Sequence, residues 1–182
     1  MANRAKDKKI ITLMKSESSR DVAFGLLVSE YSERLYWHIR KMILNHDDTD
    51  DVLQNTFIKV FQAFDSFRGD SSLFTWLYRI ATNETLTFLD KKKRQISSTS
   101  QEFNDYLIDN LQSDSEFSGD EIQRKLQLAV QKLPEKQRLV FNMKYFDDLK
   151  FTEISEIVGT SVGGLKASYH HAVKKIEEYM LE

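Results

Sequence analysis

The stretch FTEISEIVGTSVGGLKASYHHAVKKIEEYM, residues 151–180, joins two segments of helical periodicity through a glycine-containing turn. Phe151–Gly159 has the length of a short helix, and Gly159 suits the position at which such a helix stops. The turn TSVGG, residues 160–164, follows, and the apolar spacing then predicts a last helix over Leu165–Met180. A short helix, a tight turn and a longer helix form the layout of a helix-turn-helix.

The predicted last helix has two different faces. The apolar face, which we expect to pack on the core, consists of Leu165, Tyr169, Ala172, Ile176 and Met180. The polar side chains of the turn and of the other face are Ser161, Lys166, Ser168, His170, His171 and Lys174. Small, polar and basic side chains near the start of a second helix suit base edges and phosphates in a major groove. A basic helix face is often only solvated, so the residues alone leave both interpretations open.

The adjacent His170 and His171 do not predict a metal site. Neighbouring side chains on a helix point about 100° apart, and no cysteine or third histidine stands at ligand spacing. The aspartates at residues 47–51 are better explained as partners of a helix dipole at a helix start. The sequence also shows no nucleophile–base set and no phosphate loop, so we expect neither an enzyme nor a cofactor.

Composition favours an all-α protein. Among 182 residues, six glycines and one proline leave few signals for strands and tight turns. The absence of cysteine rules out disulfides and suits a reducing cytoplasm. The apolar runs are far shorter than a membrane span, and the basic start lacks the apolar core of a signal peptide. We therefore expect a cytoplasmic protein without stable membrane insertion.

Charge divides the chain into three parts. Residues 1–94 carry a net charge of +3, residues 95–121 carry −7 without any Lys or Arg, and residues 122–182 carry +2. The middle part, QISSTSQEFNDYLIDNLQSDSEFSGDE, is rich in Ser, Asp and Asn, and its apolar residues are too sparse for a core of their own. The pattern predicts two small helical domains joined by a flexible acidic linker, with room for a short helix near Tyr106–Leu111.

Helical periodicity runs through both predicted domains. In the first domain the predicted helices span Val22–Leu44, Asp51–Phe64 and Leu73–Leu89. In the second they span Ile122–Leu133 and a segment that begins at Pro134. The helix that contains Arg79 and Asn83 mixes aromatic with basic residues, a combination that suits unstacked bases in single-stranded DNA. Trp76 in the same helix is better explained as core.

Two stretches, DDVLQNTFIKVFQAFDSFRGDSSLFTWLYRIATNETLTFLDKKKR (50–94) and LQLAVQKLPEKQRLVFNMKYFDDLKFTEISEIVGTSVGGLKASYHHAVKKI (126–176), span most of these domains. Their runs FRGDS, TWLYRIA, LPEKQR and EISEIVG resemble the extracytoplasmic-function (ECF) subfamily of bacterial sigma-70-type RNA polymerase sigma factors. The resemblance covers nearly all of the chain in the right order. It implies region 2 over residues 1–94, a linker over 95–121 and region 4 over 122–182.

This resemblance implies a transcription initiation factor rather than an enzyme. Such a factor binds core RNA polymerase, recognises the promoter −10 and −35 elements and promotes DNA melting. The partners that the resemblance implies are the clamp helices of the largest polymerase subunit, the flap region, promoter DNA and an anti-sigma factor.

The resemblance also implies contact residues in region 2. The polymerase-binding residues would be Asp51, Gln54, Asn55 and Phe57, and the family usually has an acidic residue where Asn55 stands. The residues that bind the −10 element would be Arg68, Gly69, Asp70, Ser71, Arg79 and Asn83. The family captures a flipped base at this loop, which must offset an unstacking cost of a few kcal/mol.

Region 4 departs from the family pattern in its last helix. Gly164 stands where a threonine is common, and Ser168 and His171 stand where arginines are common, while Leu165 and Lys166 keep the usual apolar–Lys pair. The helix is therefore less cationic than is typical, and we expect it to read a different −35 sequence. The residues expected to contact this element are Ser161, Lys166, Ser168, His170, His171 and Lys174.

A helix-turn-helix transcription regulator that acts without core polymerase is the alternative. Such a protein needs an effector pocket or a dimerising helix, and the sequence offers no candidate for either.

Overall fold

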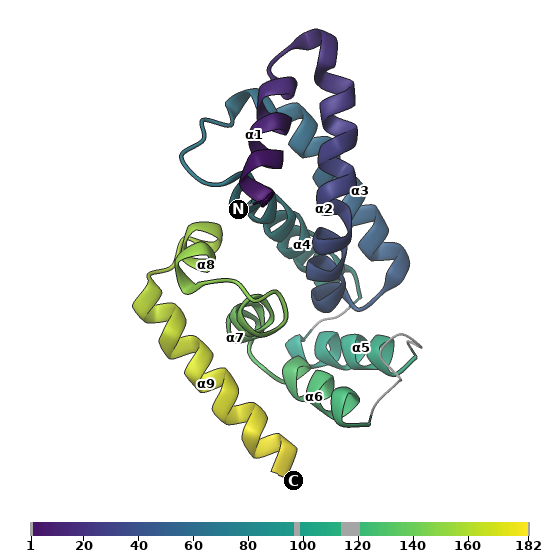
Figure 1. Cartoon of the computed structure of the whole chain (residues 1–182). Coiled ribbons are helices and arrows are strands. Elements are labelled where there is room, and N and C mark those ends of the chain that lie inside the picture. Colours follow the sequence, from purple (N-terminus) through teal and green to yellow (C-terminus); the bar gives the residue numbers. More distant parts are fainter. Residues whose placement is uncertain (1, 97–98, 114–120, 182) are drawn as a thin grey trace.

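The computed structural model describes residues 2–96, 99–113 and 121–181, and these residues form helices joined by short connections, without a strand among them. In chain order the longer elements are α1 (Ala2–Met14), α2 (Arg20–Ile43), α3 (His46–Ala63), α4 (Leu73–Ile96), α5 (Ser100–Ser113), α6 (Glu121–Gln131), α7 (Glu135–Phe141), the π-helical turn η4 (Asn142–Phe146), α8 (Phe151–Val158) and α9 (Val162–Leu181). In Figure 1, α1–α4 form the upper part of the molecule and α5–α9 the lower part. The all-α fold predicted from the sequence is confirmed.

Local capping decides where α2 ends and α3 begins. Leu44 has a left-handed φ of 59° and ends α2. The Asn45 side chain accepts a hydrogen bond of 2.9 Å from the backbone N–H of Asp48. This is the typical hydrogen bond of an N-cap asparagine. Because of this cap, α3 begins at His46, earlier than the predicted start at Asp51.

The helix α1 was not predicted, and tertiary contacts hold it on α2. Its apolar side chains Ile10 and Met14 are buried in the core. The Tyr31 hydroxyl of α2 donates a hydrogen bond to the carboxylate of Asp7 in α1. Burial, followed by this bond, raises the pKa of Tyr31. Because one side of α1 is polar, its apolar packing face was not recognised from the sequence pattern.

The predicted acidic linker contains the helix α5, which extends beyond the short helix allowed near Tyr106–Leu111. Phe103, Leu107 and Leu111 lie at helical spacing and are buried, because α5 packs between α4 and α6. These side chains are too few for a core of their own, but neighbouring helices supply the rest of the apolar surface. Residues 97–98 and 114–120, where we also expected flexible chain, lie outside the described residues.

In the second domain, α6, α7 and α9 surround an apolar cluster. Its buried members are Ala129, Val130, Leu133, Phe141, Ala172 and Ile176. Pro134 is the N-cap of α7, so the helix begins at Glu135, one residue after the predicted start. Arg138 of the LPEKQR run is only 3% exposed and donates a hydrogen bond of 2.9 Å to Oε1 of Gln131. This arginine therefore holds α6 and α7 together.

The two domains pack directly on each other. One continuous apolar core contains Leu77 and Ala81 of α4 together with Leu139 of α7 and Ile154 and Ile157 of α8. The helix α8 packs directly against α4, and Figure 1 shows α8 and α7 close to α4. The sequence pattern gave no indication of this arrangement, because each domain has an amphipathic pattern that a separate core would also explain.

Candidate nucleic-acid and protein interfaces

The helix α3 presents a polar surface at the positions expected to bind polymerase. Asp51, Gln54 and Asn55 are all exposed. Phe57 differs, because it is only 8% exposed and packs edge-to-face on Phe24 at a centroid distance of 6.3 Å. Phe57 therefore lies on the buried side of α3, beneath the exposed polar surface. Sequence reasoning missed Ile58, which is 48% exposed and continues the Asp51–Gln54–Asn55 surface by one helical turn.

Two aspartates at the start of α3 form ion pairs within the protein. The carboxylate of Asp48 lies 3.0 Å from the Lys92 ammonium, and this hydrogen bond is the main reason that the pKa of Lys92 is raised. Asp50 lies 3.6 Å from His46, one turn away. Within the described residues there is no group of three or more His, Asp or Glu side chains that could hold a metal ion.

The loop expected to bind the −10 element is anchored by aromatic residues. The rings of Phe64, Phe67 and Trp76 pack on one another with centroid distances of 5.1 to 5.9 Å. The loop residues Arg68, Gly69 and Asp70 are exposed and Ser71 is half-buried. Gly69 has a φ of 81°, a conformation that favours glycine. The core assignment of Trp76 agrees with its packing.

Arg79 and Asn83 lie one turn apart on α4, and both are exposed. In this structure, however, Arg79 is bound to α8 of the second domain. Its Nε and Nη2 donate hydrogen bonds of 3.1 and 2.6 Å to the backbone carbonyl of Glu156. Glu156 belongs to the last turn of α8, where carbonyls have no partner within the helix. Arg79 thus caps the C-terminus of α8.

The helix-turn-helix is present, with a shorter turn than the sequence predicted. Gly159 has a φ of 72° and ends α8, as expected. The helix α9 already begins at Val162 rather than at Leu165. The reason is Ser161, whose hydroxyl accepts a hydrogen bond of 3.3 Å from the backbone N–H of Gly164 and so caps the helix. Ser161 is therefore an N-cap, whatever DNA contact it makes.

The apolar and polar faces of α9 lie as predicted. Leu165, Ala172 and Ile176 are buried, and Tyr169 stacks on Phe141 with an angle of 16° between the rings. The side chains that stand exposed on the other side are Lys166, His170, His171 and Lys174. The rings of His170 and His171 have centroids 6.0 Å apart and are tilted against each other. Together these residues form an exposed polar surface on α9.

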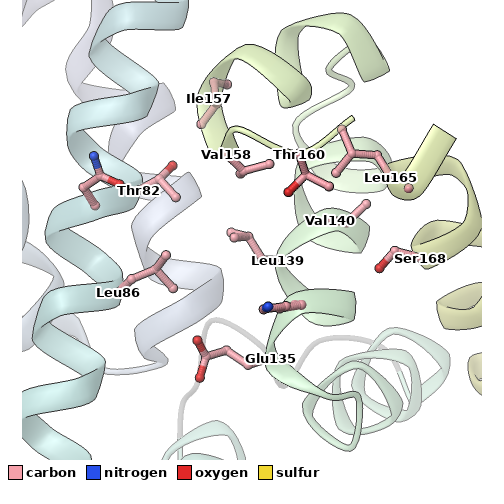
Figure 2. A pocket seen from close by; sticks show the side chains of 13 residues that line it. Thr82, Leu86, Glu135, Leu139, Val140, Ile157, Val158, Thr160, Leu165 and Ser168 are labelled. Atoms are coloured by element: carbon pink, nitrogen blue, oxygen red, sulfur yellow. The ribbon is translucent and has the colours of Figure 1, made fainter. Parts of the chain in front are cut away.

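A cavity of about 460 Å³ lies between α4 and the helices α7, α8 and α9. Figure 2 shows Thr82 and Leu86 of α4 on one side and Leu139, Val158 and Leu165 across the space. Asn83 and the half-buried Ser168 also line this cavity. Two residues expected to contact DNA, one from each domain, therefore border the same cavity between the domains.

Sequence reasoning missed a buried polar cluster between the domains, centred on Asp147 after η4. One carboxylate oxygen lies 2.7 Å from Nδ1 of His38, and the other lies 2.9 Å from Nζ of Lys41, both in α2. Burial raises the pKa of Asp147, but the charges and hydrogen bonds of His38 and Lys41 outweigh this effect and leave the pKa below its ordinary value. His38 and Asp147 are 109 residues apart, so no local pattern could have joined them.

Among the described residues, no helix combines the length and the apolar character needed to cross a membrane.

Comparison with known proteins bears on both domains. The family model described as Sigma-70 region 2 matches residues 27–95, and the model described as Sigma-70, region 4 matches residues 123–176. The chain is 30% identical to the ECF RNA polymerase sigma factor SigW of Bacillus subtilis over 166 residues, which cover 87% of this chain and 89% of SigW. It is 27% identical to the RNA polymerase sigma-H factor of Pseudomonas aeruginosa, over 98% of this chain and 95% of that protein.

A solved structure shares the fold. It is the sigma factor RpoE in complex with the anti-sigma factor NepR from Bartonella quintana, with a TM-score of 0.66 and 19% identity over 86% of this chain and 96% of that chain. The identity to SigW and its coverage, together with the two sigma-70 regions matched along this chain, show that the chain belongs to the ECF family of RNA polymerase sigma factors.

Proposed function

We propose that this sigma factor uses residues 1–94 as region 2 and residues 122–182 as region 4, with residues 95–121 as the linker. Region 2 binds core polymerase and the −10 element, and region 4 reads the −35 element. The observation that carries this division is the order of the two matched regions along one chain. The exposed basic side of α9 supports it.

The polymerase-binding surface in this proposal lies on α3. It consists of Asp51, Gln54 and Asn55, supported from beneath by the buried Phe57, and it docks on the clamp helices of the largest subunit. The exposed Ile58 adds an apolar contact at the edge of this surface. Region 4 meets the flap region of the polymerase.

The DNA contacts come from both regions. For the −10 element the proposed residues are Arg68, Gly69, Asp70, Ser71, Arg79 and Asn83. For the −35 element they are Ser161, Lys166, Ser168, His170, His171 and Lys174. The protein acts in the cytoplasm without a cofactor. An anti-sigma factor is a further partner, and the complex of RpoE with NepR supports this possibility by its similar fold.

Charge reversal on α3 tests the polymerase surface. We expect Asp51→Lys to lower the affinity for core polymerase by at least about tenfold, because a charge at a complementary interface is replaced by its opposite. The matched control is Asp90→Lys, which reverses the same charge at an exposed position of α4. Affinity is measured by the change in fluorescence anisotropy of labelled sigma factor on titration with core polymerase.

Equal affinities for Asp51→Lys, Asp90→Lys and wild type would refute the assignment to α3. The regulator that works without polymerase is tested in the same series. Gel filtration of the wild-type chain with core polymerase yields co-elution for a sigma factor and two separate peaks for that regulator.

A further inference from the structure

Two proposed −10 contacts on α4 face region 4: Arg79 donates hydrogen bonds to the Glu156 carbonyl of α8, and Asn83 borders the cavity between the domains. We propose that the free chain has a closed state, locked by Asp147, His38 and Lys41, in which α8 packs on the −10 surface of α4 and engages Arg79. Binding of single-stranded promoter DNA then requires release of these three residues, which we term the Asp147 cluster. The inference rests on the proposed function for its consequence, whereas the lock itself rests on geometry alone.

The Asp147 cluster is placed to hold the two domains together. His38 and Lys41 belong to α2 of region 2, and Asp147 follows η4 in region 4. The His38 and Asp147 side chains are only 1% and 3% exposed. The second ring nitrogen of His38 lies 3.0 Å from the hydroxyl of Thr82, so the cluster also reaches α4, the helix that α8 covers.

Because the Asp147 cluster is buried, its stability depends on the presence of all three side chains. A buried carboxylate is costly unless it is paired, and removal of one partner leaves a charge without compensation. Lys41 adds a further contact, because its ammonium lies 5.2 Å from the centre of the Phe146 ring in η4. Next to it, the side-chain nitrogen of Asn142 lies 3.2 Å from the sulfur of Met42. All of these contacts cross from α2 to η4 and its end.

The closed state and DNA binding compete for Arg79. Its Nε and Nη2 donate hydrogen bonds to the carbonyl of Glu156, so this edge of the guanidinium is not available to a phosphate or a base at the same time. Glu153 and Glu156 of α8 also line a cavity of about 730 Å³ next to the loop residues 69–72. These two carboxylates add negative charge at the surface where DNA would lie, which opposes its approach.

The polymerase surface is not covered in this state. Asp51, Gln54 and Asn55 on α3 remain exposed, and so do Lys166 and Lys174 on α9. The closed chain therefore engages Arg79 of α4 with α8 while its α3 surface stays accessible. A partner can reach α3 before the domains separate.

Pulsed electron paramagnetic resonance distances test the lock. Because the sequence has no cysteine, the exchanges Ser29→Cys in α2 and Thr152→Cys in α8 introduce the only two labelling sites, both at exposed positions. Asp147→Asn keeps the shape of the side chain and removes its charge. Its matched control is Asp148→Asn, the same change at the next residue, whose side chain is 97% exposed.

We expect one short distance in the wild type and in Asp148→Asn, and a second, longer distance in Asp147→Asn. Lys41→Gln, on the other domain, should give the same longer distance, and the double variant should add little, because both changes break one interaction. Far-UV circular dichroism shows that helix content is kept. A folded Asp147→Asn variant and a folded Lys41→Gln variant that both keep the wild-type distance would overturn the proposal.

The consequence for DNA is measured on the same variants with a fluorescent pool of random-sequence single-stranded DNA. If the open fraction rises from about 5% to about half, the apparent affinity rises about tenfold. Opening together with this gain supports both the lock and the −10 surface. Opening without any gain keeps the lock and refutes the assignment of Arg79 and Asn83 to DNA. A gain without opening overturns the lock, because affinity then does not depend on the domain arrangement.

Discussion

At the scale of single residues, Asn83 offers a direct test of promoter melting. It is exposed on α4 and borders the cavity between the domains. We expect Asn83→Ala to slow open-complex formation on a duplex promoter, because a lost contact with the opened strand no longer offsets unstacking. Holoenzyme kinetics on duplex and on pre-melted bubble templates measure this effect. Rescue by the bubble is the expected result, whereas equal defects on both templates would indicate a fault in folding or in polymerase docking.

The polar residues of α9 divide into expected phosphate and base contacts. Lys174 is 68% exposed in its side chain and lies 3.9 Å from Glu178. We expect Lys174→Ala to weaken binding to all promoter variants alike and to flatten the logarithmic salt dependence by about one unit.

Lys166→Ala and His171→Ala should instead change the preferred −35 base, by about 1–3 kcal/mol for each lost base contact. Binding of promoter variants by the holoenzyme, measured at two salt concentrations, distinguishes the two outcomes. Even losses across all −35 sequences for Lys166→Ala and His171→Ala would mean that α9 holds the backbone without reading the bases.

At the scale of elements, the two glycines around the turn before α9 should respond to the same substitution with opposite signs. A Cβ at Gly159 or at Gly163 meets no atom within 4 Å, so backbone conformation alone decides the effect. Gly159 has a φ of 72°, and we expect Gly159→Ala to lower the free energy of unfolding by about 1–2 kcal/mol. Gly163 is already helical, and Gly163→Ala should raise it by about 0.4–1 kcal/mol.

Urea unfolding followed by circular dichroism measures both values. A change of the same sign for the two variants would contradict the assignment of Gly159 to the end of α8 and of Gly163 to the first turn of α9.

At the scale of the whole molecule, the Asp147 cluster couples the domains to pH. The ordinary pKa of an aspartate is 3.8, and Asp147 in the folded chain lies below it. A carboxylate with a lowered pKa stabilises the fold fully above its unfolded pKa, and this contribution is lost as the pH falls towards the folded value. The difference in unfolding free energy between wild type and Asp147→Asn should therefore be constant near neutral pH and shrink below about pH 4.

Urea unfolding at a series of pH values measures this difference, with Asp148→Asn as the control for an exposed carboxylate. A difference between wild type and Asp147→Asn that stays constant down to the lowest pH at which both fold would show that Asp147 is not stabilised by its partners.

The sequence by itself determined most of the helices, though not α1, together with the helix-turn-helix and the family. Apolar spacing reports which face of a helix is buried, and Gly159 marks the end of α8 because few other residues adopt its conformation. The exposed Asp51, Gln54 and Asn55 and the polar side of α9 were also predictable, since an amphipathic helix has its polar residues outside. The first residues of α3 and α9 were predicted less well, because Asn45 and Ser161 cap these helices through single hydrogen bonds to the backbone.

Only the tertiary structure decided how the domains meet. Asp147 and His38 are 109 residues apart, and the Arg79 side chain binds a carbonyl 77 residues away, a group that every residue possesses and no pattern can mark. The apolar residues of α5 likewise acquired a core only from neighbouring helices. Local sequence specifies propensity and amphipathic faces, whereas the choice of which faces meet depends on complementary shape and charge between distant segments. That choice places a proposed DNA contact, Arg79, in a hydrogen bond between the two domains.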